Sequence, residues 1–182
     1  MHPRLIGFCG LKGSGKDTAA GPFLHAGWQK VAFAQTLKDM VHVLLRARGC
    51  HDPERYTDGD RKEFATPYLM NRTARHVMQT LGTEFGRDQV HPDLWIDTWR
   101  IKVSDLLEAG EGVVVTDIRF QNEADAIKKL GGRVFRVVRP RLTNGDLHAS
   151  ETGVANIDAT AELLNNFPTA RDFQVHIHDR FF

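Results

Sequence analysis

The amino-acid sequence predicts an α/β fold in which a parallel sheet is covered by helices on both faces. Short apolar runs alternate along the chain with helical segments, and this alternation is typical of such sheets. A glycine-rich loop follows the first apolar run. The length of 182 residues fits one domain, with or without a small lid, since a domain holds roughly 150 residues.

The apolar pattern predicts the elements in chain order. Strands are expected at residues 5–9, 30–34, 113–116 and 133–138. Helices are expected at residues 17–26, 37–49, 93–108 and 121–130. In the tail, the alternating Val175 and Ile177 predict a last short strand, on which His176 and His178 would share one face.

Two polar stretches interrupt this alternation, at residues 51–71 and 139–158. Both contain proline and glycine, and both are candidate mobile elements over a ligand. Surface loops without a function are the alternative interpretation.

The composition excludes several functional classes. Lys and Arg number 24 against 23 Asp and Glu, so the formal charge of +1 leaves no overall electrostatic footprint for duplex DNA or an anionic membrane. No apolar run approaches the roughly 20 residues that span a bilayer, and no signal peptide is evident, so a cytoplasmic protein is expected. Neither Cys9 and Cys50 nor His148 with Glu151 has the ligand cluster of a zinc site.

Residues 10–16 match the phosphate-binding pattern G-x-x-x-x-G-K. The loop lies between a predicted strand and a predicted helix, which is the context of a phosphate-binding loop, or P-loop. Its glycines let backbone N–H groups surround phosphate oxygens, and Lys16 can reach the β and γ phosphates of a nucleotide. The residues expected to bind ATP are Gly10, Lys12, Gly13, Ser14, Gly15, Lys16, Asp17 and Thr18.

The position after Lys16 departs from the common pattern. P-loops usually carry Ser or Thr there, whose hydroxyl holds Mg²⁺, whereas this chain has Asp17 followed by Thr18. Asp17 would hold the metal directly or through water, or it would stabilise the first helical turn by its charge. The sequence leaves these alternatives open, and Asp17 and Thr18 are the candidate Mg²⁺ ligands.

Asp117 is expected at the carboxyl end of the strand at 113–116, where parallel α/β sheets bind their ligands. It is a candidate for binding Mg²⁺ or a substrate, and a cap for the next helix is the alternative. Arg119, Asn122 and Glu123 follow it and extend this polar group.

Two residue pairs have helical spacing. Arg75 and Gln79 are four residues apart and share one helical face. Trp95 and Trp99 have the same spacing, which favours core packing over a platform for stacking bases.

Together these motifs resemble the deoxynucleoside monophosphate kinases of tailed bacteriophages, of which the T-even phage enzyme is the familiar example. The resemblance spans most of the chain and is far more specific than the P-loop alone. It is carried by residues 10–18, 37–39, 61–64, 75–84, Trp95, 115–119, Glu123, 137–140 and 146–151. The family is similar in carrying Lys-Asp-Thr after the last loop glycine, so Asp17 fits the resemblance.

The resemblance implies a three-layer P-loop kinase fold, with residues 1–182 forming a single domain that carries a small lid and acceptor-binding insertion. It implies transfer of the γ-phosphoryl group of ATP, with Mg²⁺ as cofactor, to a deoxynucleoside 5′-monophosphate. ADP and the diphosphate are the products, in nucleotide biosynthesis for DNA replication. The acceptor-binding region would lie at about 51–72 and the lid at about 139–158.

The resemblance also implies roles for single residues. Lys16, Asp117 and Arg139 would act in catalysis. The acceptor would be bound by Lys38, Arg72, Arg75, Gln79, Trp95, Asp117, Arg119 and Glu123. No nucleic acid or membrane is expected as a partner, a homodimer is compatible with the sequence, and the location would be the host cytoplasm if the chain is phage-encoded.

A monophosphate acceptor needs no catalytic base, because its second pKa of about 6 leaves the attacking oxygen ionised near neutral pH. The barrier is electrostatic, since unit charges about 4 Å apart repel by about 4 kcal/mol at an effective dielectric of about 20. Lys16, Mg²⁺ and arginines offset that repulsion. We expect Arg139 to move in on closure and to exclude water.

Other functional classes also fit a P-loop. A kinase acting on a hydroxyl acceptor, such as a nucleoside, dephospho-coenzyme A or phosphomevalonate, would use Asp17 or Asp117 as its base. A nucleotide-binding regulatory module would bind ATP without transferring phosphate. A DNA-stimulated ATPase is disfavoured by the balanced charge and the lack of a basic stripe.

Overall fold

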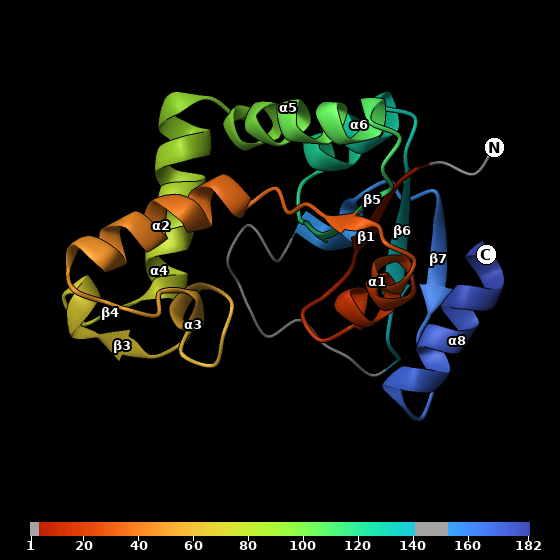
Figure 1. Cartoon of the computed structure of the whole chain (residues 1–182), viewed down its shortest axis with the longest axis horizontal. Helices are drawn as coiled ribbons and strands as arrows, with labels where there is room; N and C mark the ends of the chain where they lie inside the picture. The colour runs from red at the N-terminus through yellow and green to blue at the C-terminus, as the bar shows by residue number, and fades with distance from the viewer. Residues whose placement is uncertain (1–3, 141–152) are drawn as a thin grey trace. The chain divides into compact units, whose positions relative to one another are not determined.

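The computed structural model describes residues 4–140 and 153–182. The chain divides into two compact units. Met1–Phe33 with Arg100–Phe182 form the first, which we call the sheet unit, and Ala34–Trp99 form the second, which we call the helical unit. Figure 1 shows the elements of both.

The described part of the sheet unit is built on a five-stranded parallel sheet with the strand order β2-β5-β1-β6-β7. The strands are β1 (Leu5–Cys9), β2 (Gln29–Lys30), β5 (Val113–Ile118), β6 (Arg133–Val138) and β7 (Ala161–Leu164). The central strand β1 is buried along its whole length, which explains its uninterrupted apolar sequence. Because all strands are parallel, their carboxyl ends share one edge of the sheet.

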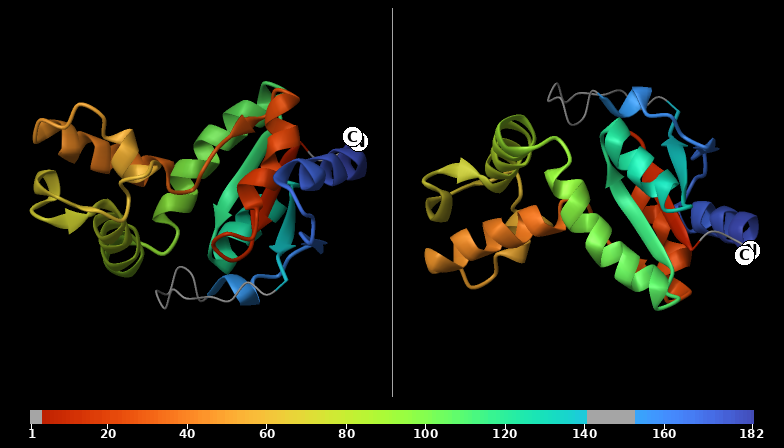
Figure 2. Two further views of the ribbon diagram at one scale, coloured as in Figure 1. Left: turned by 90° about the horizontal axis from the view of Figure 1, so that it is seen from below. Right: turned by 90° about the horizontal axis from the view of Figure 1, so that it is seen from above.

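Helices cover both faces of this sheet (Figure 2). On one face, α1 (Lys16–His25) and α8 (Ala170–Phe181) pack together and share a core cluster with the strands. On the other face, α6 (Gln121–Lys129) packs against β1 and β6. Gly7 of β1 leaves room there, since a Cβ atom at this position would lie 2.7 Å from Cδ1 of Ile127. The three layers are therefore helix, sheet and helix.

The helical unit holds α2 (Gln35–Ala47), α3 (Glu54–Thr57), α4 (Ala74–Gln79) and the short antiparallel pair β3 (Ala65–Thr66) and β4 (Arg72–Thr73). A 3₁₀ turn, η1 (Pro67–Leu69), joins the two strands, and α4 continues as a π-helical segment, η2 (Thr80–Val90). The boundary between the units falls within α5 (Leu94–Glu108). Leu37, Val41 and Leu45 line the buried face of α2 at helical spacing and anchor the core of this unit.

The parallel sheet between helices confirms the predicted fold class. The predicted strand at 133–138 is β6, and the four predicted helices are α1, α2, α5 and α6. The predicted strand at 30–34 is shorter, because β2 ends at Lys30. Beyond it, the backbone N–H of Val31 still donates to the carbonyl oxygen of Val114 on β5, whereas the backbone N–H of Phe33 donates to the side chain of Asp117.

The predicted strand in the tail is wrong, because Ala170–Phe181 form the helix α8. Thr169 caps this helix by accepting a hydrogen bond from the backbone N–H of Asp172. Phe173 and Ile177 are fully buried and four residues apart, whereas Val175 is 52% exposed. The burial period is therefore that of a helix, and the last strand of the sheet is the earlier β7. His176 and His178 accordingly lie on a helix and do not share a strand face.

In the sheet unit, η3 (Gly153–Asn156) is a 3₁₀ turn before β7. Residues 141–152, which include His148, Glu151 and most of the predicted lid, lie outside the described residues. Among the described residues, no helix combines the length and the apolar character needed to cross a bilayer.

Candidate functional site

The P-loop connects β1 to α1 and turns through three glycines with left-handed backbone conformations. Gly10, Gly13 and Gly15 have φ angles of 143°, 83° and 104°. A Cβ atom at Gly10 would lie 2.4 Å from the carbonyl oxygen of Val137, and one at Gly15 would lie 2.4 Å from Nδ2 of Asn165. At both positions glycine is needed for the backbone angle and for space.

Lys16 is the first residue of α1, and its side chain folds back over the loop. Its Nζ donates hydrogen bonds to the carbonyl oxygens of Gly10 and Leu11 at 2.7 and 2.9 Å. Ser14, inside the loop, is 1% exposed, and its hydroxyl has no hydrogen-bond partner among the described residues. The ammonium group of Lys16 therefore lies over the loop that the sequence predicts to bind phosphate.

A hollow of about 280 Å³ opens beside the loop within the sheet unit. The P-loop side is lined by Gly13, Gly15, Lys16, Asp17 and Thr18. Arg139, directly after β6, and residues between β7 and α8 complete the lining: Asn165, Phe167, Pro168, Thr169 and Ala170. The structure thus brings Arg139 together with most of the residues predicted to bind ATP. Lys12 is exposed on the loop.

Asn165 connects the end of β7 to the P-loop. Its Nδ2 donates to the carbonyl oxygen of Ser14 at 2.8 Å, and its backbone N–H donates to that of Val138 at 2.7 Å. The sequence analysis missed Asn165 because it did not predict β7. The available signal was the apolar pair Leu163-Leu164 followed by two asparagines, which is typical of a strand that ends at a polar edge.

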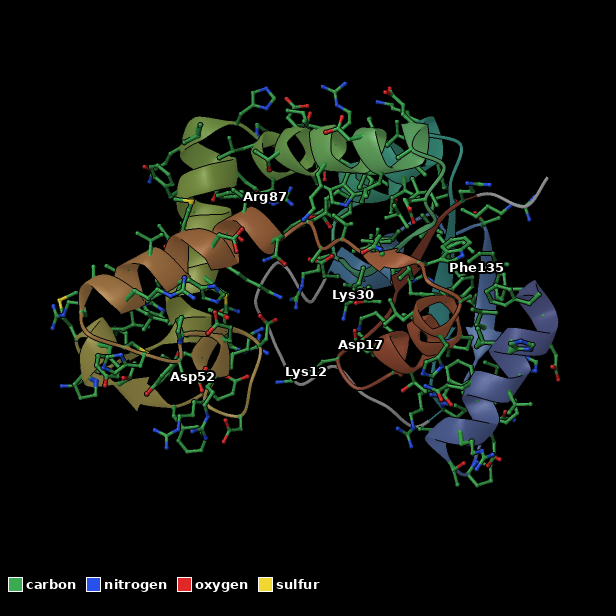
Figure 3. The ribbon with its side chains drawn as sticks, viewed as in Figure 1. Lys12, Asp17, Lys30, Asp52, Arg87 and Phe135 are labelled. Carbon is green, nitrogen blue, oxygen red and sulfur yellow. The ribbon has the colours of Figure 1, made fainter. Side chains whose placement is uncertain are left out.

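Asp17 is held through one carboxylate oxygen. Lys30 at the end of β2 donates from Nζ to Oδ1 of Asp17 at 2.7 Å, and Figure 3 labels both residues. The hydroxyl of Thr116 on β5 donates to the same oxygen at 2.8 Å. Burial raises the pKa of Asp17, but the hydrogen bonds from Lys30 and Thr116 outweigh burial and hold the pKa below its ordinary value of 3.8. Asp17 is therefore ionised at neutral pH. Lys30 and Thr116 are site residues that the sequence analysis did not single out.

The other two carboxylates of the predicted site contact the backbone. Oδ1 of Asp117 accepts from the N–H of Phe33 at 3.1 Å. Glu123 is 3% exposed, and its Oε2 accepts from the N–H groups of Arg119 and Phe120 at 2.7 and 3.1 Å. These bonds hold the connection from β5 into α6, which gives Glu123 a structural role as a helix cap. The roles of Asp117, Arg119 and Glu123 toward an acceptor stay predictions.

Two predicted acceptor-binding cations of the helical unit are paired with carboxylates from the segment between α3 and β3. Lys38 forms an ion pair with Asp58, and Nε of Arg75 donates to Glu63 at 2.6 Å. Burial raises the pKa of Asp58, but the hydrogen bond and the charge of Lys38 outweigh burial and hold the pKa below its ordinary value of 3.8. Both cations are mostly buried and oriented by these partners.

Trp95 is a core residue of the helical unit. It is 5% exposed, its indole N–H donates to the carbonyl oxygen of Gly82 at 2.7 Å, and a Cβ atom at Gly86 would lie 2.5 Å from its ring. Arg72 is exposed on β4, and Gln79 is half-buried at the end of α4. The predicted acceptor residues thus divide between the helical unit and the sheet unit.

Comparison with known proteins identifies the family. The family model described as deoxynucleotide monophosphate kinase matches residues 60–174. A mimivirus protein (Acanthamoeba polyphaga mimivirus), whose name assigns it to these kinases, is 33% identical over 183 residues. That match covers 95% of this chain and 93% of the viral protein. The chain belongs to the deoxynucleotide monophosphate kinase family.

Other relatives agree with the deoxynucleotide monophosphate kinase family. The deoxynucleotide monophosphate kinase of Enterobacteria phage T4 is 28% identical over 95 residues, which are 52% of this chain and 39% of the T4 protein. The dephospho-CoA kinase of Campylobacter jejuni has a TM-score of 0.51 and 13% identity over 97% of this chain and 95% of its own. That likeness shows the fold alone. The chain is therefore a kinase of this family, and the resemblance found in the sequence is confirmed.

Proposed function

We propose that the protein transfers the γ-phosphoryl group of ATP to the 5′-phosphate of a deoxynucleoside monophosphate. The products are ADP and the deoxynucleoside diphosphate. One observation carries this proposal in a kinase of this family: Lys16, Asp17 and Arg139 line a single hollow of about 280 Å³ beside the P-loop.

ATP binds with its phosphates on the P-loop and with its base toward the connection between β7 and α8. A phosphate oxygen is a stronger acceptor for the ammonium of Lys16 than the neutral carbonyl oxygens of Gly10 and Leu11 that it now contacts. The N-terminus of α1 adds partial positive charge at the same place. Phe167 and Pro168 offer an apolar surface of the kind that an adenine ring contacts.

The donor set beside the loop fits Mg²⁺. Asp17 supplies an ionised carboxylate and Thr18 a hydroxyl, and Mg²⁺ prefers such oxygen ligands. We assign both residues as candidate metal ligands, directly or through water. When bound, Mg²⁺ neutralises charge on the β and γ phosphates.

The transfer itself needs charge neutralisation and no base. An ionised oxygen of the acceptor forms a bond to the γ-phosphorus, and the bond from that phosphorus to the β–γ bridging oxygen breaks, leaving the electron pair on ADP. Lys16 and Arg139 stabilise the charge on the transferred group, and Arg139 excludes water on closure. A guanidinium suits this role because it stays charged and binds two phosphate oxygens at once.

The residues assigned to acceptor binding are described for each unit by itself. In the helical unit, Lys38, Arg72 and Arg75 bind its phosphate, and Gln79 and Trp95 support the binding surface. Asp58 and Glu63 orient two of these cations before the acceptor arrives. In the sheet unit, the acceptor side is assigned to Asp117, Arg119 and Glu123. We expect the reaction to take place in the cytoplasm, with neither nucleic acid nor a membrane as a partner. A homodimer stays a prediction.

An acceptor panel tests the proposed function. The protein is incubated with ATP, Mg²⁺ and each common nucleoside monophosphate in deoxy and ribo form, with nucleosides and dephospho-coenzyme A in parallel. Diphosphate formed from deoxynucleoside monophosphates alone is the expected result. Phosphorylation of a nucleoside or of dephospho-coenzyme A, with monophosphates untouched, would make the protein a hydroxyl kinase. Tight ATP binding with no product would make it a binding module.

A further inference from the structure

The carboxylate of Asp17 and the hydroxyl of Thr116 form a pair whose chemical groups are exchanged relative to the common P-loop site. In P-loop NTPases, Mg²⁺ is held by a Ser or Thr that follows the P-loop lysine and by an aspartate at the end of a neighbouring strand. In this chain the carboxylate follows Lys16, and the hydroxyl lies on β5. The two groups are 2.8 Å apart.

In this chain, Asp117 on β5 corresponds to the strand aspartate of the common site, and it contacts a different part of the structure from Thr116. Asp117 follows Thr116 directly, and successive residues of a strand point to opposite faces of the sheet. Oδ1 of Asp117 accepts from the backbone N–H of Phe33, whereas Thr116 is 6% exposed and donates to Asp17. Thr116 therefore contacts the P-loop helix through its hydroxyl.

Lys30 completes the arrangement from a third element. Its Nζ and the hydroxyl of Thr116 donate to the same oxygen of Asp17, Oδ1. The other oxygen, Oδ2, makes no hydrogen bond within residues 4–140 and 153–182. Two donors thus fix the carboxylate through one oxygen, and Asp17 lines the hollow beside Lys16 and Thr18.

We propose that Thr116 and Lys30 are positioning residues that fix Oδ1 of Asp17. They thereby leave Oδ2 to bind the Mg²⁺ of MgATP, directly or through water. This inference rests on the proposed function and adds two residues to its metal site. Relative to the common P-loop site, the carboxylate then lies on the P-loop helix and the hydroxyl on β5.

The first experiment measures binding and no turnover. The dissociation constant of a non-hydrolysable ATP analogue is determined by calorimetry with and without Mg²⁺, and the ratio of the two constants is called the magnesium effect. Thr116→Val should reduce the magnesium effect about tenfold or more, since loss of a group that orients a metal ligand typically costs 10–100-fold in metal affinity. Binding of the analogue without Mg²⁺ should stay unchanged, and Thr116→Ser should retain the effect of the wild type.

Lys30→Met should reduce the magnesium effect in the same direction. The matched control is Lys128→Met, which removes the ion pair of Lys128 with Asp158 in the same unit. That control should keep both dissociation constants. If Lys30→Met weakens binding of the ATP analogue equally with and without Mg²⁺, the positioning role of Lys30 is overturned.

The second experiment restores the common arrangement. Asp17→Ser alone removes the carboxylate, and Thr116→Asp alone places two carboxylates against each other. The double variant Asp17→Ser/Thr116→Asp should recover a magnesium effect at least about tenfold above either single variant, because the pair is again complete. A double variant that binds the analogue without Mg²⁺ but recovers no magnesium effect would overturn the exchange.

Asp117→Asn supplies the competing outcome. A magnesium effect that is lost in Asp117→Asn and intact in Thr116→Val would overturn the proposal and assign the metal site to Asp117. The acceptor panel separates this failure from that of the proposed function. If the protein forms the diphosphate but Thr116→Val keeps the magnesium effect of the wild type, the positioning role is refuted and the proposed kinase activity is retained. If no acceptor gives a product, the proposed kinase activity itself is refuted.

Discussion

Nδ2 of Asn165 donates a hydrogen bond to the carbonyl oxygen of Ser14 at 2.8 Å, joining two residues that are 151 positions apart. The bond links the carboxyl end of β7 to the loop that follows β1. Both groups are buried, so water cannot replace the bond at low cost. The far end of the chain therefore helps to set the shape of the P-loop.

Asn165→Ala is expected to lower the free energy of unfolding by about 1–3 kcal/mol, because it leaves a buried carbonyl oxygen without its donor. ATP affinity should fall with it, since the loop loses a support. Denaturant unfolding and calorimetric ATP titration measure both effects. Asn166→Ala, at the exposed neighbouring position, is the control and should match the wild type. If the two variants have the same free energy of unfolding, Asn165 does not support the P-loop.

Lys16→Met should reduce turnover by roughly 10²–10³-fold or more, since it removes a charge that stabilises the transferred phosphoryl group. The fold should persist, as circular dichroism and thermal unfolding would show. Lys129→Met, an exposed lysine at the end of α6, controls for loss of a positive charge. Retained activity in Lys16→Met would exclude the P-loop from the reaction.

Arg139→Ala should reduce kcat by roughly 10³-fold, the scale of other phosphoryl-transfer arginines, with a smaller change in the KM for ATP. Steady-state kinetics with ATP and the best acceptor measure this split. Arg133→Ala removes an exposed arginine at the opposite end of β6 and should leave kcat unchanged. Near-normal turnover of Arg139→Ala would refute its role.

Ile177→Ala should lower the free energy of unfolding by about 2–5 kcal/mol, because the side chain is fully buried in the cluster shared by α1, α8 and the sheet. Val175→Ala should have little effect, since Val175 is 52% exposed on the same helix. Denaturant unfolding compares the two. Similar costs at both positions would favour a strand over a helix in this segment.

The ion pair of Lys38 with Asp58 predicts a pH-dependent contribution to stability. The pKa of Asp58 is lower in the folded protein than its ordinary value of 3.8, so as the pH falls below that value the unfolded chain takes up a proton first. The contribution is therefore fully present above pH 3.8 and is lost as the pH falls through the lower, folded pKa.

Asp58→Asn should accordingly destabilise the protein by up to about 1 kcal/mol at pH 7, the range of an ion pair whose carboxylate is half exposed to solvent. The difference from the wild type should shrink toward zero in the acid range below pH 3.8. Unfolding curves recorded from pH 7 to pH 3 test this, with Asp52→Asn, at an exposed position, as the control. A difference that stays constant across this range would contradict the assignment.

Local signals in the sequence determined several elements of both units. The apolar run of β1, the glycines of residues 10–16 and the apolar face of α2 each specify one element through residues close together in the chain. The resemblance to the phage kinases rested on such local motifs, and it identified the family. The parallel direction of the strands, and with it their common carboxyl edge, follows from the alternation of strands and helices.

Local periodicity predicted the wrong element where the sequence did not show which element a segment packs against. Val175 and Ile177 alternate as in a strand, but Phe173 and Ile177 form the buried face, because α8 packs on α1. The spacing of Trp95 and Trp99 predicted core packing, and the burial of both side chains confirms it. The contact of Trp95 with Gly86 was not evident from the sequence.

The details of the site were decided by the tertiary structure. Whether Asp17 caps a helix or joins a polar network depends on Lys30 and Thr116, which lie 13 and 99 positions away along the chain. Asn165 reaches Ser14 only because β7 lies beside β6 at the edge where the P-loop begins. A single sequence records residue types and local spacing, whereas hydrogen bonds between distant residues are set by how the strands assemble, and the site depends on those bonds.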